Sequence, residues 1–196
     1  IVLTQCFGVL GLLMFNNGFM FAFLNKLEVS ASLILLLLSM PFAGRAVMQI
    51  PAAILSDRFG KKRLGYIGLM VSISGFGVLC ASSYLPKLFV EGTAIVGIVF
   101  YALGAAVFGG SWFALLSPIV PEEIRGSFFG WLRVSWQLVG VCFTFVVMAL
   151  LKMYTDLWIF QLIAFVVLVA LVGRLVFYTR IPELERTGRS DQTLKA

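Results

Sequence analysis

The sequence predicts an all-α membrane protein with six transmembrane helices. The chain of 196 residues is 61% hydrophobic and only 12% charged, whereas soluble domains average roughly 45–50% apolar and about 25% charged residues. The hydrophobic residues also gather into six long runs, and each run reaches the ~20 residues that a helix needs to cross a bilayer. A soluble chain of this length would expose much of that apolar surface, whereas lipid solvates it.

The six predicted helices cover about residues 1–24, 31–56, 63–83, 92–120, 127–151 and 154–179. The first run has neither a basic flank nor a small-residue cleavage site, so we interpret it as a spanning helix and not as a signal peptide. The chain begins with Ile1, and we expect the natural start to lie upstream. Residues 1–180 are then one transmembrane bundle, and the polar segment 181–196 is expected to be a cytoplasmic linker.

Basic residues are distributed unequally between alternate connections, which predicts the orientation of the chain. Three connections carry one lysine each, namely Lys26, Lys87 and Lys152. The other set is richer and comprises Arg58, Lys61, Lys62, Arg63, Arg125, Arg180, Arg186, Arg189 and Lys195. By the positive-inside rule the richer set faces the cytoplasm, so both ends of the chain are expected in the cytoplasm, with the bundle in the plasma (inner) membrane. This pattern also favours a lipid bilayer over nucleic acid as the partner of a chain with net charge +6.

The residue types argue against an enzyme. The chain contains no histidine, its three cysteines all lie in apolar runs, and no CxxC pair occurs. A metal site or a disulfide framework is therefore not expected, and no Gly-rich phosphate loop with its lysine is present. We expect neither a cofactor nor catalytic residues, because a membrane enzyme would need a nucleophile with a base, or a set of metal ligands.

The connection between the second and third predicted helices is the most informative segment. It reads A-I-L-S-D-R-F-G-K-K-R over residues 53–63 and resembles the signature loop of the major facilitator superfamily, G-x-x-x-D-R-x-G-R/K-R/K-R/K. The residues that carry the resemblance are Ala53, which replaces the first glycine, with Asp57, Arg58, Gly60, Lys61, Lys62 and Arg63. An ordinary basic loop that only sets topology is the alternative interpretation.

A second segment supports the resemblance. Residues 121–126 read P-E-E-I-R-G, similar to the turn between the fourth and fifth helices of many superfamily members. The rigid fork of Arg125 suits a carboxylate, so we predict a pair with Asp57 across the cytoplasmic face. Together the motifs form the expected cytoplasmic gate.

The resemblance has implications for the architecture. Family members have twelve helices in two six-helix halves, and each half contains two inverted three-helix repeats. This chain corresponds to the N-terminal half, and segment 181–196 is expected to lead to a second six-helix half in the same full-length chain. The resemblance also implies that Asp57 engages that other half and stabilises one state of the transport cycle.

Polar side chains inside the apolar runs are costly in lipid, so each one is a candidate for the solute pathway. The candidates are Asn16, Asn17, Arg45, Gln49, Tyr101 and Gln137. The alternative is that Asn and Gln only bond neighbouring helices. No carboxylate lies in the middle of a run, and an intramembrane arginine without a local acid favours an anionic or hydrogen-bonding solute. The glycine-rich stretches 72–77 and 104–110 are predicted to be faces where helices pack closely.

These observations predict a secondary active transporter that moves a small-molecule solute across the membrane by alternating access. The alternative function is that of a non-transporting membrane scaffold or receptor that kept the fold and lost the transport cycle.

Overall fold

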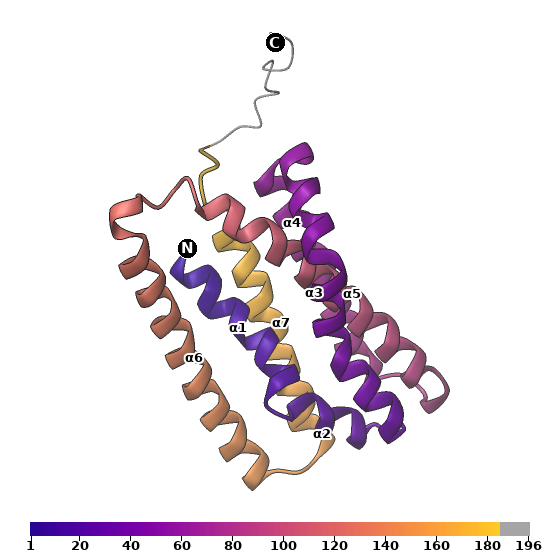
Figure 1. Ribbon diagram of the computed structural model, residues 1–196. Helices are drawn as coiled ribbons and strands as arrows, with labels where there is room; N and C mark the ends of the chain where they lie inside the picture. Colours follow the sequence, from indigo (N-terminus) through magenta and orange to yellow (C-terminus); the bar gives the residue numbers. More distant parts are fainter. Residues whose placement is uncertain (185–196) are drawn as a thin grey trace.

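The computed structural model describes residues 1–184, and this part of the chain is a helical bundle without strands (Figure 1). The remaining residues of the predicted linker, 185–196, lie outside the described residues. The elements in chain order are α1 (Val2–Asn16), α2 (Phe19–Lys26), α3 (Ala31–Phe59), α4 (Lys61–Ser82), α5 (Lys87–Leu116), the short 3-10 helix η1 (Glu122–Ile124), α6 (Arg125–Met153) and α7 (Leu157–Thr179).

The helices match the six predicted spans. Five of them, α3 to α7, are long and apolar enough to cross a membrane, and α1 with α2 forms a sixth span that is bent by 59°. The chain is therefore an integral membrane protein. The largest error in the predicted boundaries concerns α5, which begins at Lys87 directly after Pro86 and ends at Leu116. Proline suits a helix start because its fixed φ is already helical and its missing N–H is not needed there.

The first predicted helix is interrupted, so the prediction of one continuous helix over residues 1–24 was wrong. Gly18 has a φ of +81°, a conformation that side chains with a Cβ rarely adopt. The side-chain oxygen of Asn17 accepts a hydrogen bond from the backbone N–H of Phe19 at 3.1 Å. This local bond replaces the helical ladder and turns the chain into α2.

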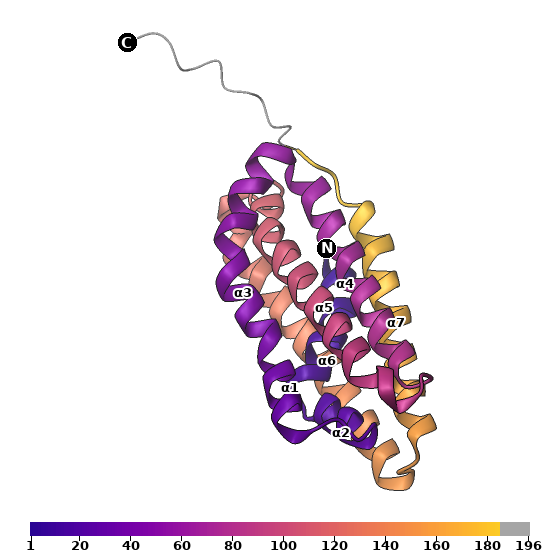
Figure 2. The ribbon, with the colours of Figure 1, turned by 90° about the vertical axis from the view of Figure 1, so that its right-hand side faces the viewer.

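The packing of the helices follows a repeat. α5 packs against α3 and α4, whereas α1 packs against α6 and α7, and the two groups meet where α4 contacts α7. Exchanging the first three spans with the last three, in order, turns each of these contacts into another of the same set, whereas the smaller contact of α2 with α3 has no counterpart of similar size between α5 and α6. Figure 2 shows α3 and α7 on opposite sides of the α4–α5 pair. The pattern is that of the two inverted three-helix repeats predicted from the sequence.

Glycines allow α4 and α5 to approach backbone to backbone. A Cβ added at Gly75 would overlap the backbone of Tyr101, and one added at Gly97 would lie 2.7 Å from the backbone nitrogen of Leu79. One added at Gly104 would lie 2.5 Å from the carbonyl oxygen of Gly68. The prediction that the glycine-rich stretches pack closely is therefore confirmed for the α4–α5 interface.

Candidate functional site

A cavity of about 690 Å³ lies among α1, α3, α5, α6 and α7. Most of its lining residues lie nearer one end of the bundle, while Leu12, Arg45 and Tyr101 reach the middle of it. This end, which we call the loop end, consists of the α3–α4 connection, the α5–α6 connection with η1 and the end of α7, all at the top of Figure 1. The polar and aromatic lining residues are Gln5, Arg45, Gln49, Tyr101, Phe108, Trp112, Phe113, Phe129, Arg133, Trp136 and Arg174.

Three arginines from three different helices line this cavity. Arg45 extends from α3 and Arg133 from α6, and both are exposed, whereas Arg174 extends from α7 and is half-buried. The positive charges of Arg45 and Arg174 are close enough to repel each other. None of the lining residues is an aspartate or a glutamate. The cavity formed by the described residues therefore carries uncompensated positive charge within an apolar bundle.

Arg174 is held in place by two contacts. Its guanidinium carbon lies 4.0 Å from the centroid of the Phe108 ring, a cation–π arrangement. On α1, the guanidinium lies so close to Gly8 that a Cβ at this position would overlap it. Its Nε atom is buried and has no hydrogen-bond partner among the described residues.

Arg174 was not among the residues predicted to line the solute pathway. The residue lies inside α7, the most hydrophobic of the spans, and the basic residues of this region were all assigned to the segment after the helix. The available signal was a single cation well within an apolar run, which is costly in lipid and points to a functional site.

Two further polar groups in the cavity wall come from α5. Trp112 is only 2% exposed, and its indole N–H has no hydrogen-bond partner among the described residues. Tyr101 lines the cavity near the middle of α5, and its ring stacks on Phe15 with a centroid distance of 4.9 Å. Buried donors are nearly always paired, so this indole N–H is an exception within the described residues. Within residues 1–184, no group of three or more potential ligands could hold a metal ion.

The structure brings together only part of the predicted solute pathway. Arg45, Gln49 and Tyr101 line the cavity. Gln137 lies exposed on α6 outside the cavity lining. Asn16 and Asn17 lie at the bend between α1 and α2, away from the cavity.

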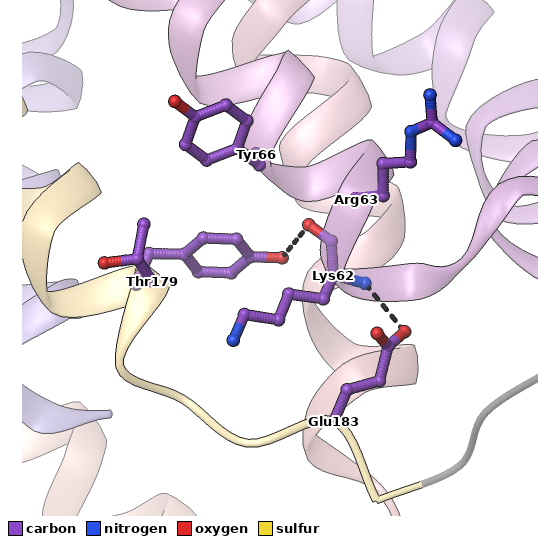
Figure 3. A pocket seen from close by; sticks show the side chains of 6 residues that line it. Lys62, Arg63, Tyr66, Thr179 and Glu183 are labelled. Atoms are coloured by element: carbon purple, nitrogen blue, oxygen red, sulfur yellow. Dashed lines mark hydrogen bonds between the residues drawn. The ribbon is translucent and has the colours of Figure 1, made fainter.

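The predicted gate motif forms the α3–α4 connection. Gly60 adopts a φ of +95°, which favours glycine and reverses the chain into α4. The backbone N–H of Lys62 donates to the Glu183 carboxylate at 3.1 Å, as Figure 3 shows, and the Tyr178 hydroxyl donates to the Lys62 carbonyl at 3.2 Å. A carboxylate is favourable at a helix N-terminus. The end of α7 and the segment after it therefore hold the start of α4, while Asp57 remains exposed.

The predicted pair between Arg125 and Asp57 was wrong. Arg125 donates instead to the carbonyls of Ser117 and Val120, at 3.2 and 3.4 Å, and lies 3.8 Å from the Glu122 carboxylate. The turn through η1 places the guanidinium beside the end of α5, where unpaired carbonyls favour a cation. Arg125 thus stabilises its own connection.

Comparison with known proteins gives the family of the chain. No curated protein and no solved structure matches the chain. The sequence does match the Major Facilitator Superfamily over residues 3–195, which is nearly its whole length. The chain therefore belongs to the Major Facilitator Superfamily, whose members are membrane transporters and not enzymes.

Proposed function

We propose that this chain is one half of a secondary active transporter, and that the arginine-lined cavity is its share of the pathway for a small solute. The cavity itself carries this proposal. Its volume of about 690 Å³ falls within the roughly 300–1,000 Å³ of pockets that bind small molecules. Charged side chains inside a membrane bundle are rare and mark solute pathways, and here three of them share one cavity.

The position of the cavity supports alternating access. The cavity extends from the loop end to the middle of the bundle, where Tyr101 lines it and packs against Phe15 and Phe76. A solute that enters from the loop end must therefore wait for a second arrangement of the helices before it leaves. In our proposal a second six-helix half of the full-length chain covers the cavity, and the two halves rock about the bound solute.

The charges at the two ends support an orientation. The basic residues of the gate motif and Arg125 lie at the loop end, whereas Lys87 at the opposite end pairs with Glu28. The positive-inside rule then favours a loop end that faces the cytoplasm of a plasma (inner) membrane, with both ends of the chain on that side. Asp57 and the basic run are proposed to contact the second half there, as a gate.

A cysteine at Gly109 tests alternating access without knowledge of the solute. Gly109 lines the cavity, and a Cβ there meets no atom within 4 Å, so the substitution Gly109→Cys fits. We expect this cysteine to react with a membrane-impermeant maleimide added from either side of the membrane. The full-length protein would be used in oriented vesicles, after Cys6, Cys80 and Cys142 have been replaced by alanine.

Two other glycines provide matched controls. Gly126 lies at the loop end and Gly92 near the opposite end, and a Cβ meets no atom within 4 Å at either position. Each of these cysteines should react from one side only, and the two sides should differ. Labelling of Gly109→Cys from a single side in every condition would contradict alternating access and favour a static scaffold.

A further inference from the structure

We infer that the solute is a small amphipathic organic anion, whose negative group binds Arg174, Arg45 and the indole N–H of Trp112. This inference rests on the proposed function, because it names the class of solute that the cavity takes. It is carried by the unpaired charges, the unpaired donors and the aromatic wall of the cavity.

The charge balance is the first step. Three guanidinium groups line the cavity, and the lining contains no carboxylate. Placing cations inside a membrane bundle without a counter-charge is costly, and the positive charges of Arg45 and Arg174 also repel each other. A bound carboxylate or phosphate would relieve both costs, because the planar fork of arginine matches these groups with two parallel hydrogen bonds.

The position of the donors is the second step. Arg174 and Trp112 both pack on Phe108, Arg174 with its guanidinium 4.0 Å from the ring centroid and Trp112 at a centroid distance of 5.3 Å. The Nε of Arg174 and the Nε1 of Trp112 are both buried without a partner among the described residues. Two side chains with unsatisfied donors therefore pack on one ring that lines the cavity. The contacts with Phe108 and Gly8 hold Arg174 in position before the solute arrives.

The apolar wall is the third step. Phe113 and Phe129 face each other across α5 and α6 with a centroid distance of 6.3 Å, and Trp136 lines the cavity beside them. Aromatic side chains offer large apolar surfaces, which a strongly hydrated inorganic ion would not use. An organic anion could place its negative group beside the arginines and its apolar ring or chain against the aromatic side chains.

Thermal unfolding of the full-length protein in detergent, followed by circular dichroism, tests this inference. The probes are benzoate, indole-3-acetate and hexanoate, each compared with its neutral amide. A ligand that binds only the folded state raises the melting temperature. We expect at least one acid to raise it by about 3 °C or more in a saturable manner, while the matching amide has no effect.

Arginine variants identify the site. Arg174→Gln should abolish the shift, and Arg174→Lys should weaken it, because lysine keeps the charge but loses the planar fork. Arg45→Gln provides a second variant if Arg174→Gln does not fold, and should also weaken the shift. Arg180→Gln is the matched control: Arg180 also lies over a phenylalanine ring, that of Phe177, but it is exposed and outside the cavity lining.

Two outcomes would overturn the inference. An equal response to acids and amides would assign the cavity to neutral solutes. No response to any acid would show that the arginines of the cavity do not bind an organic carboxylate. Either result is compatible with labelling of Gly109→Cys from both sides, so the anion inference can fail while the proposed function stands.

Discussion

Replacing Gly104 with alanine is expected to destabilise the bundle by about 3 kcal/mol, which is at the upper end of the usual cost of overpacking. Gly104 lies on α5 against the backbone of α4, and an added Cβ would overlap the backbone nitrogen of Ser72 and lie 2.5 Å from the carbonyl oxygen of Gly68. Backbone atoms cannot change rotamer, so the two helices must move apart. Because α5 also packs against α3, the separation disturbs half of the bundle.

The matched control is Gly109→Ala on the same helix. A Cβ at Gly109 meets no atom within 4 Å, and alanine favours a helix by about 1 kcal/mol over glycine. This variant should be as stable as the wild type or slightly more so. The measurement is thermal unfolding in detergent together with the yield of monodisperse protein. Equal melting temperatures for the two variants would show that the α4–α5 contact does not depend on glycine.

Replacing Asp57 with asparagine is expected to leave stability unchanged but to shift the transport cycle. Asp57 is exposed in the last turn of α3, where the helix dipole disfavours an acid. Its charge therefore does not stabilise this half. If it binds the second half in one state of the cycle, losing a charged hydrogen bond removes about 1.5–3 kcal/mol from that state. The ratio of Gly109→Cys labelling rates from the two sides should then change by about tenfold or more.

Glu123→Gln is the control for this prediction, since Glu123 is an exposed acid at the same end of the bundle but lies outside the signature loop of residues 53–63. It should leave the labelling ratio unchanged. If Asp57→Asn inserts normally and the ratio of labelling rates does not change, the prediction is contradicted. The motif would then be a basic loop that only sets topology.

The sequence predicts the spans well because a bilayer imposes one simple requirement on each of them, a long apolar helix. It also predicts the close packing of the glycine-rich stretches, since small residues have few other uses between membrane helices. The bend at Gly18 was not predicted because a hydropathy pattern carries no information about residues that favour turns. The pair Asn17-Gly18 is a local turn signal, although we interpreted Asn17 as a pathway residue.

The cavity was harder to predict because it depends on which helices meet. Arg45 was predicted from its place inside an apolar run, and Arg174 carries the same signal in the sequence. Only the packing of α7 against α1 shows that the Arg174 guanidinium lies next to Gly8 and Phe108. The predicted pair of Arg125 with Asp57 was wrong because the true partners are local. Arg125 donates to backbone carbonyls of its own connection. The prediction had considered only carboxylate side chains as partners for its positive charge.

The charge selectivity of the cavity is the most direct test of its role. Gly130 lines the cavity, and a Cβ there meets no atom within 4 Å, so Gly130→Cys places a thiol inside it. Two thiol reagents of similar size would be compared in the full-length protein, the anionic sulfonatoethyl and the cationic trimethylammonium-ethyl methanethiosulfonates. Each rate would be divided by the rate of the same reagent with free mercaptoethanol.

At low ionic strength we expect the anionic reagent to be preferred by about tenfold, as a positive cavity concentrates anions. The preference should disappear when Arg45 and Arg174 are both replaced by glutamine. Equal corrected rates, or a preference for the cationic reagent, would contradict an anion pathway, because they would show that the arginines are already neutralised within the full-length protein.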